Sequence, residues 1–384
     1  MNIITTTESL TQFCNDARSK DFLCVDTEFM RESTFYSELC LIQVATDTDE
    51  AIIDPLAKGL DLTPFNELLM LGSLTKVMHA ARQDMEIFYS LCQAVPNPIF
   101  DTQIGAMALG LGDSVGYMAL VKNRLGLILD KGARFTDWSR RPLSEKQLSY
   151  ALADVTHLCD LYPGMIDELR ERGRLSWIEE EIKPQLEENL YNFDPDTAWQ
   201  RLKIRNPRPE NMAVLKAAAS WREQQAIQRN IPRRRVVKDD ALYDIAQNKP
   251  RNAKALMKLR GVPKGFSNSR GVDGLIKMIN YGLDNVDDYA PIVPKPKNMP
   301  AQLGPTIEML RTLLKLCTEY EDVAPRLVAN ASDIEQIAAY GDKADVAAMS
   351  GWRYEIFGSQ ALDLLAGKMA LRLEGRKVVT QKLD

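Results

Sequence analysis

Short apolar runs that suit β-strands occur early in this chain, and the rest of its 384 residues shows mainly helical patterns. The runs lie at residues 22–27, 38–46, 50–54, 76–79 and 97–100. Three of them come close together, and the later two alternate with stretches in which apolar residues recur at helical spacing. This order predicts an α/β domain, a mixed sheet flanked by helices, followed by all-α structure.

The first of these runs ends in an acidic pair. In the segment FLCVDTEFMRE, Asp26 and Glu28 are separated by one residue, and alternate side chains of a strand point to the same side. Two convergent carboxylates repel each other unless a shared proton, a nearby Lys or Arg, or a divalent cation neutralises them. If a cation does so, ligation by oxygen alone favours Mg²⁺ or Mn²⁺.

Two further acidic sites lie downstream. Asp84 follows the fourth apolar run, at the point where a helical pattern begins. Residues 142–162 predict a second helix, because a capping box opens the segment and its apolar residues form a stripe. On that helix Tyr150 and Asp154 are four residues apart, so they share one face.

These motifs resemble the DEDDy branch of 3′→5′ exonucleases, whose pattern is D-x-E, a later single Asp, and Y-x-x-x-D. The likeness covers residues 1–170, and longer strings in that range are similar to the ribonuclease D family. They are LCLIQVAT (39–46), FDTQ (100–103), LGLGDSVGYMAL (109–120) and FTDWSRRPLSEKQLSYALADV (135–155). The resemblance implies a ribonuclease H-like exonuclease domain.

The resemblance also implies a role for each residue. Asp26, Glu28 and Asp154 would hold the cation that activates a water, and Asp26 and Asp84 would hold a second cation at the leaving 3′ oxygen. Tyr150 would hydrogen-bond the attacking water. A phenol with an ordinary pKa of about 10 is a poor base at neutral pH, so we expect it to orient the water. The chemistry agrees, because paired cations suit phosphodiester hydrolysis.

Aromatic and basic residues are candidates for nucleic-acid contact. Phe29 directly follows the acidic pair and would either wedge against the terminal base or pack as a strand residue. Trp138 and Arg140 lie in the string that leads into the second predicted helix. A basic run later in the chain would either contact RNA or form a solvated face. Its centre is Arg233, Arg234 and Arg235.

Composition narrows the alternatives. The net charge of −5 argues against nonspecific coating of nucleic acid by the whole molecule, and only two histidines leave little material for a zinc site or a Ser-His-Asp triad. The six cysteines form no C-x-x-C pair, which is typical of reduced thiols in the cytoplasm. We find no leader, no membrane-spanning run and no nucleotide-binding fingerprint, so we expect no membrane attachment and no organic cofactor.

Proline-rich breaks predict the domain organisation. We expect an exonuclease domain at 1–191, a linker at 192–210, a helical domain at 211–289, a proline-rich linker at 290–305 and a second helical domain at 306–384. The first helical domain resembles the HRDC module, including the segment VVKDDALYDIA at 236–246. The second resembles a more divergent module of the same type.

The residues themselves support two-metal hydrolysis of phosphodiesters, and the resemblance implies a metal-dependent 3′→5′ exoribonuclease. The resemblance implies that it trims 3′ ends of structured RNAs such as tRNA precursors and releases nucleoside 5′-monophosphates, and we expect a monomer. The carboxylates alone do not distinguish RNA from DNA, so a DNA exonuclease of the proofreading or repair type is the alternative. A noncatalytic RNA-binding scaffold is a third hypothesis, but it predicts a lost carboxylate, and all four are intact.

Overall fold

The computed structural model describes residues 1–130, 132, 136–262, 271–293, 300 and 302–383. Contacts divide the chain into two units. The first contains Met1–Glu28, Leu41–Glu187 and Lys297–Asp384, and the second contains Phe29–Cys40 and Glu188–Pro296. In the described part of the chain, no helix is long and apolar enough to cross a membrane.

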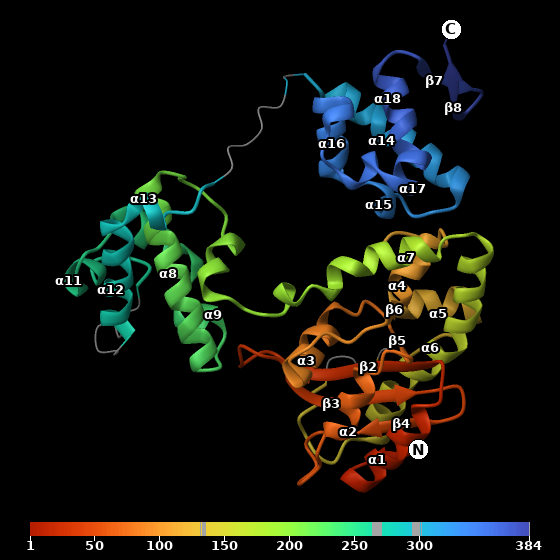
Figure 1. Ribbon diagram of the computed structural model, residues 1–384, viewed down its shortest axis with the longest axis horizontal. Coiled ribbons are helices and arrows are strands. Elements are labelled where there is room, and N and C mark those ends of the chain that lie inside the picture. The colour runs from red at the N-terminus through yellow and green to blue at the C-terminus, as the bar shows by residue number, and fades with distance from the viewer. Residues whose placement is uncertain (131, 133–135, 263–270, 294–299, 301, 384) are drawn as a thin grey trace. The chain divides into compact units, whose positions relative to one another are not determined.

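A six-stranded mixed sheet forms the centre of the first unit (Figure 1). Its strands are β1 (Ile3–Ile4), β2 (Phe22–Met30), β3 (Glu38–Ala45), β4 (Glu50–Ile53), β5 (Thr75–Met78) and β6 (Ile99–Asp101), in the order β1-β4-β3-β2-β5-β6. β2, β5 and β6 run parallel, whereas β3 is antiparallel to β4. The predicted strands and the mixed sheet are confirmed. Strand β1 was not predicted, because two residues are too few to show a strand pattern.

Helices flank this sheet and fill the connections between its strands. They are α1 (Thr7–Ala17), α2 (Thr63–Leu69), α3 (Arg82–Cys92), α4 (Thr102–Ala108), α5 (Tyr117–Leu125), α6 (Glu145–Glu171) and α7 (Leu175–Ile182), with a short 3-10 turn at Lys183–Leu186. A further 3-10 turn at Glu188–Leu190 belongs to the second unit. The longest, α6, begins with the predicted capping box between Ser144 and Gln147. Its apolar stripe is buried, with Val155 and Leu158 at most 1% exposed, so the face that carries Tyr150 and Asp154 is fixed.

The C-terminal part of the first unit is helical and ends in a hairpin. Its elements are α14 (Gly304–Glu321), α15 (Pro325–Val328), α16 (Ala331–Tyr340), α17 (Gly351–Arg353), α18 (Ser359–Leu365), β7 (Met369–Glu374) and β8 (Lys377–Lys382), with 3-10 turns at Gly341–Lys343 and Ala347–Met349 and a π turn at Tyr354–Gly358. The prediction of helix throughout this region is wrong for residues 369–382. Apolar and polar residues alternate there around Gly375, whose positive φ of 61° makes the turn.

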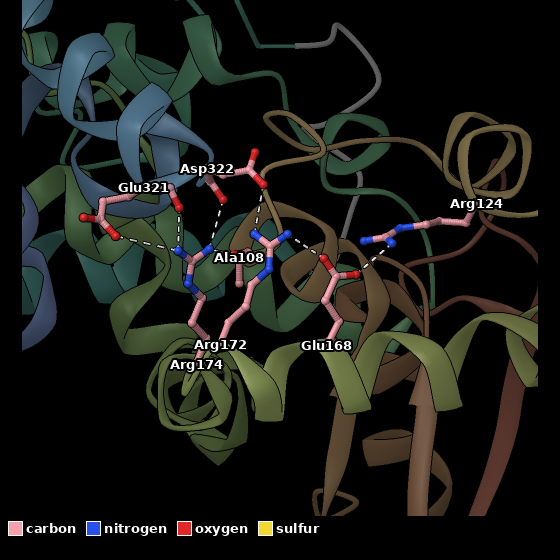
Figure 2. A network of polar contacts seen from close by, with 7 residues as sticks. All are labelled: Ala108, Arg124, Glu168, Arg172, Arg174, Glu321 and Asp322. Atoms are coloured by element: carbon pink, nitrogen blue, oxygen red, sulfur yellow. Dashed lines mark hydrogen bonds and ion pairs between the residues drawn. The ribbon is translucent and has the colours of Figure 1, made fainter.

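A buried arginine joins this C-terminal part to the exonuclease domain. Arg174, 7% exposed, donates to the carbonyl oxygens of Ala108, Glu321 and Asp322 at 2.8, 2.5 and 2.9 Å (Figure 2). Beside it, Arg172 donates to the carboxylates of Glu168 and Asp322. Because carbonyls on both sides share one guanidinium, neither side can leave without exposing unsatisfied polar groups.

The glycine-rich string 109–120 lies against the same C-terminal helices. Gly110 has a φ of +73°, and a Cβ there would come within 2.3 Å of the Asp322 side chain, so only glycine fits. Asp113 accepts a hydrogen bond from the backbone N–H of Arg326 at 2.9 Å. Further along, Trp177 and Trp352 stack at 4.0 Å. The string therefore serves to dock the C-terminal part onto the exonuclease domain.

The second unit is a helical bundle with its own core. It contains α8 (Pro209–Gln228), α9 (Arg233–Val236), α10 (Asp239–Asn248), α11 (Ala253–Leu256), α12 (Gly271–Asp284), α13 (Val286–Tyr289) and the 3-10 helix η3 (Pro195–Arg201). Ala198 and Leu202, in the segment that we expected to be a linker, are buried in this core. Phe35 is also buried there, and Asn230 accepts hydrogen bonds from the N–H groups of Phe35 and Tyr36.

These contacts assign part of the predicted linker at 192–210 to the core of the second unit. Apolar side chains at 193–204 suffice to pack a segment that proline content alone marks as an extended connection. The proline-rich linker predicted at 290–305 falls in part on 294–299 and 301, which lie outside the described residues.

We predict that Arg174→Met loosens the C-terminal part from the exonuclease domain. Three carbonyls lose their donor, which should lower the free energy of unfolding by about 2–4 kcal/mol. Hydrogen exchange of residues 304–322 is the measurement. The exposed Arg170→Met on α6 is the matched control, since Arg170 pairs with the similarly exposed Asp167 at 2.6 Å. Equal protection of that helix in both variants would contradict the docking role.

Candidate active site

Strand β2 delivers the predicted acidic pair to the sheet's carboxyl end. Leu23, Cys24 and Val25 are fully buried and hold the strand between β3 and β5. Beyond Val25 the side chains alternate in exposure: Asp26 and Glu28 are partly exposed, whereas Thr27 is 6% exposed. The strand therefore presents the two carboxylates on one side and the Thr27 hydroxyl on the other, as the spacing predicts.

Asp84 stands in the first turn of α3, next to β2. The Thr27 hydroxyl donates a 2.5 Å hydrogen bond to Asp84 Oδ1, which ties the two elements together. The chain reaches α3 through a tight turn at Ala80, where φ is +57°. Asp101, at the end of β6, holds this turn by accepting from the N–H groups of Ala80 and Ala81 at 2.9 and 3.0 Å. The neighbouring strand thus sets where Asp84 lies.

A histidine and a threonine brace the same turn. The Thr102 hydroxyl donates to the carbonyl of Met78 at 3.1 Å, so it accepts from Nδ1–H of His79 at 2.9 Å. Burial lowers the pKa of His79, which keeps the ring neutral. His79 is therefore a structural residue of the turn.

The carboxylates are close enough to perturb one another. Burial and the charge of Asp154 raise the pKa of Asp26 to about 8. Burial and the charge of Asp26 raise the pKa of Asp84 well above its ordinary value, against the opposing effect of the Thr27 hydrogen bond. Asp26 thus interacts with an acidic partner on α3 and another on α6, and each negative charge raises the cost of ionising its neighbour.

Tyr117 marks the edge of this cluster. Its hydroxyl donates to the carbonyl of Ala153 at 2.8 Å, which fastens α5 to α6 beside Asp154. Burial raises the pKa of Tyr117, and the charges of Asp154 and Asp26 raise it further. The phenol therefore stays protonated and acts as a donor. Tyr117 is not part of the D-x-E or Y-x-x-x-D motif, so the sequence offered no reason to single it out.

Tyr150 and Asp154 line a cavity of about 180 Å³ on the exposed face of α6. Its other lining residues are Met118, Leu129, Asp130, Lys146, Ser149 and Ala153. Trp138, 2% exposed, lies beside Tyr150 with ring centroids 6.2 Å apart. The indole therefore supports the Tyr150 ring and offers no open face for a base, contrary to the role suggested for it by sequence.

Arg141 anchors the segment that precedes α6. Its guanidinium binds both carboxylate oxygens of Asp54 at 2.7 Å, and Nη1 donates to the carbonyls of Trp138 and Arg140 at 2.8 Å. A bidentate pair of this kind fixes direction as well as distance. Asp54 follows β4, so the sheet determines where α6 begins and hence where Tyr150 lies.

The oxygen-rich cluster suits a hard divalent cation. Among the described residues, no three His, Cys, Asp or Glu side chains are grouped so that they could hold a metal ion by themselves. Mg²⁺ commonly keeps several waters and takes only one or two carboxylates from the protein, completing its shell with substrate phosphate. Two carboxylate pairs that share Asp26, both destabilised by repulsion, match that requirement. Glu28 lies two residues beyond Asp26 on β2, on the same side of the strand.

The candidate nucleic-acid contacts differ in their exposure. Phe29 is partly exposed, and Arg140 is exposed and pairs with Asp137 at 3.1 Å. Arg233 donates two 2.6 Å hydrogen bonds to Glu223, which is 1% exposed, and its guanidinium stacks over Phe35 at 4.4 Å. It therefore stabilises the second unit. Arg234 and Arg235 are exposed and remain candidates.

Known proteins share these features along the whole chain. A family model described as 3'-5' exonuclease matches residues 1–170, and the HRDC domain model matches residues 211–277. Ribonuclease D of Nitrobacter hamburgensis is 45% identical over 99% of both chains, and that of Bartonella henselae is 41% identical over 100% of this chain and 94% of its own.

Among solved structures, Escherichia coli RNase D, described as an exoribonuclease involved in structured RNA processing, is 27% identical with a TM-score of 0.76. The alignment covers 96% of this chain and 99% of that one. Sequence identity over the full length, the exonuclease and HRDC matches and the shared fold agree, so the chain belongs to the ribonuclease D family.

Proposed function

We propose that this ribonuclease D family member trims the 3′ ends of structured RNAs, tRNA precursors among them, with the help of two divalent cations. A 3′→5′ exoribonuclease activity follows from its family. The observation that carries the metal-assisted mechanism is the burial of Asp26 and Asp84 together with the repulsion of Asp26 with Asp84 and Asp154, since a bound divalent cation would stabilise all three carboxylates in their charged form. Mg²⁺ or Mn²⁺ suits the oxygen ligands.

Each residue then has a defined task. Asp26, Glu28 and Asp154 would hold one cation, and Asp26 with Asp84 the other. Bound there, the cations would acidify water and offset the charge that builds on the phosphate and the leaving oxygen. The Tyr150 hydroxyl, at the cavity wall beside Asp154, positions the attacking water by a hydrogen bond. Hydrolysis at the last phosphodiester releases a nucleoside 5′-monophosphate.

The second unit supplies grip on the RNA. Arg234 and Arg235 project from the HRDC bundle and would contact phosphates, with Arg140 as a further candidate near the active site. Arg233 holds the bundle together through Glu223. We also propose that the enzyme acts as a monomer in the cytoplasm and needs no organic cofactor.

We predict that the protein shortens single-stranded RNA one nucleotide at a time in Mg²⁺ and leaves DNA of matched sequence largely intact. Asp154→Asn should reduce the rate by several orders of magnitude, because a metal ligand is lost. Tyr150→Phe should reduce kcat by roughly 10²-fold with little change in KM, because only the orientation of water is lost.

Asp160→Asn is the matched control, since this exposed residue lies on the same helix and contacts His157. Product lengths on a denaturing gel and single-turnover rates give the readout. Equal cleavage of RNA and DNA would favour the DNA exonuclease, and full activity of folded Asp154→Asn would refute the mechanism.

We predict that the metal-free protein loses stability as pH rises from about 4 to about 8. The folded-state pKa of Asp26 is raised above its ordinary value of 3.8 to about 8, so the folded state holds a proton that the unfolded state has lost in this window. Asp26→Asn should therefore stabilise the metal-free protein at pH 8, on the order of 1–3 kcal/mol.

Thermal unfolding in EDTA between pH 5 and 8 measures this effect, and added Mg²⁺ should restore the wild type but not the variant. Melting curves that shift in parallel for wild type and Asp26→Asn would show that this carboxylate carries no such penalty.

We predict that Arg234→Ala combined with Arg235→Ala weakens RNA binding and flattens its salt dependence by about 0.7 per lost contact on single-stranded RNA. Replacing the exposed pair Arg376 and Lys377 of the C-terminal hairpin by alanine is the control. Fluorescence anisotropy across a salt series measures both. If the slope of log affinity against log salt matched that of the wild type, Arg234 and Arg235 would be solvent-exposed residues that do not contact RNA.

A further inference from the structure

A positively charged side chain, that of Lys146, lines the cavity to which Tyr150 and Asp154 also contribute. Lys146, in the first turn of α6, is the single basic residue among the described residues that line it. Lys146, Tyr150 and Asp154 succeed each other at intervals of four, so they lie along one face of the helix. Lys146 therefore starts one helical turn from the proposed water-orienting residue and about two turns from the proposed metal ligand.

Lys146 is held by an acidic residue of the same cavity. Its Nζ lies 3.0 Å from Oδ2 of Asp130, and the two side chains are 62% and 72% exposed. Ion pairs this exposed are weak and are exchanged readily for a competing anion. A lysine side chain is also flexible, so its ammonium group can follow a phosphate without rearrangement of the backbone.

A substrate strand needs such a cation. The three aspartates repel a polyanion, and the proposed cations would serve only the scissile phosphate. The next phosphate on the 5′ side lies outside that cluster. Met118, Leu129 and Ala153 give the cavity an apolar wall, so the phosphate of a strand passing through it would meet Lys146, the positive group among the lining residues that the structure describes.

We propose that Lys146 binds the backbone phosphate immediately 5′ of the scissile one, and that Asp130 competes with RNA for this lysine. The inference rests on the proposed function, because it assigns a contact to the same substrate. In this proposal Lys146 is a substrate-positioning residue, and the Asp130 carboxylate occupies the place of the phosphate when no RNA is bound. An ion pair that merely fastens α6 would behave differently, because loss of either partner would then have the same effect.

The test compares Lys146→Met and Asp130→Asn on a short unstructured RNA in Mg²⁺. Lys146→Met should raise KM about tenfold, change kcat much less, and flatten the slope of log(kcat/KM) against log salt by about 0.7. Asp130→Asn should lower KM, the opposite direction. Lys146→Arg should keep most of the affinity. Losses of the same sign in both variants, or no change in either, would overturn the proposal.

Two further arms separate a direct contact from a general effect of charge. In the Lys146→Met background, Asp130→Asn should have little effect, because Asp130 acts through the lysine; an undiminished gain would overturn the competition. On a dinucleotide with a single phosphodiester, Lys146→Met should match the wild type, since the phosphate that it binds is missing. An equal loss on dinucleotide and tetranucleotide would refute the assigned position.

Arg170→Met and Asp167→Asn, an exposed pair at the other end of α6, control for changes of charge on the same helix. Cleavage of RNA by the wild type in Mg²⁺ is measured alongside, so that a failure of this inference can be told from a failure of the proposed function. Absence of wild-type cleavage refutes the proposed function, whereas cleavage that Lys146→Met leaves unaltered refutes only the role of Lys146.

Discussion

Repulsion among carboxylates that the fold forces together is the constraint on which the exonuclease domain depends. Burial and the charge of Asp154 raise the pKa of Asp26 to about 8, and burial and the charge of Asp26 raise the pKa of Asp84. Such an arrangement costs stability in the metal-free protein, so the surrounding structure must hold it in place. Two devices do so: Asp101 clamps the turn before α3, and Arg141 clamps the segment before α6. Both draw on neighbouring strands, which makes the sheet the rigid frame of the site.

The C-terminal helices belong to the same frame. Arg174 bonds carbonyls on both sides of the junction, and Arg353 similarly joins the carbonyl of Leu327 to the acidic side chains of Glu180 and Glu181. A guanidinium can satisfy several acceptors at once, which suits a junction made of helix ends with spare carbonyls. The C-terminal part is therefore built onto the exonuclease domain, and the proposed grip on RNA is left to the HRDC unit and to the cavity beside α6.

Sequence alone predicted the parts of the site that depend on local spacing. Alternation placed Asp26 and Glu28 on one side of a strand, and helical periodicity placed Tyr150 and Asp154 on one face. It could not reveal Thr27, Tyr117, Asp101 or Arg141, because their partners lie on other elements and only the tertiary fold brings them together. Burial could not be predicted either: Trp138 is 2% exposed, and Arg233 is bonded to the buried Glu223. The hairpin at 369–382 was missed because its alternation is short.

The count of Mn²⁺ ions bound per chain tests the central claim most directly. Electron paramagnetic resonance can follow a titration of the metal-free protein with an uncleavable phosphorothioate RNA present to complete the coordination shells. The account predicts two ions for the wild type and, because Asp26 is shared by both proposed sites, fewer than one for a folded Asp26→Asn variant. Undiminished binding by that variant, or no binding by the wild type, would contradict the view that these carboxylates form a metal site.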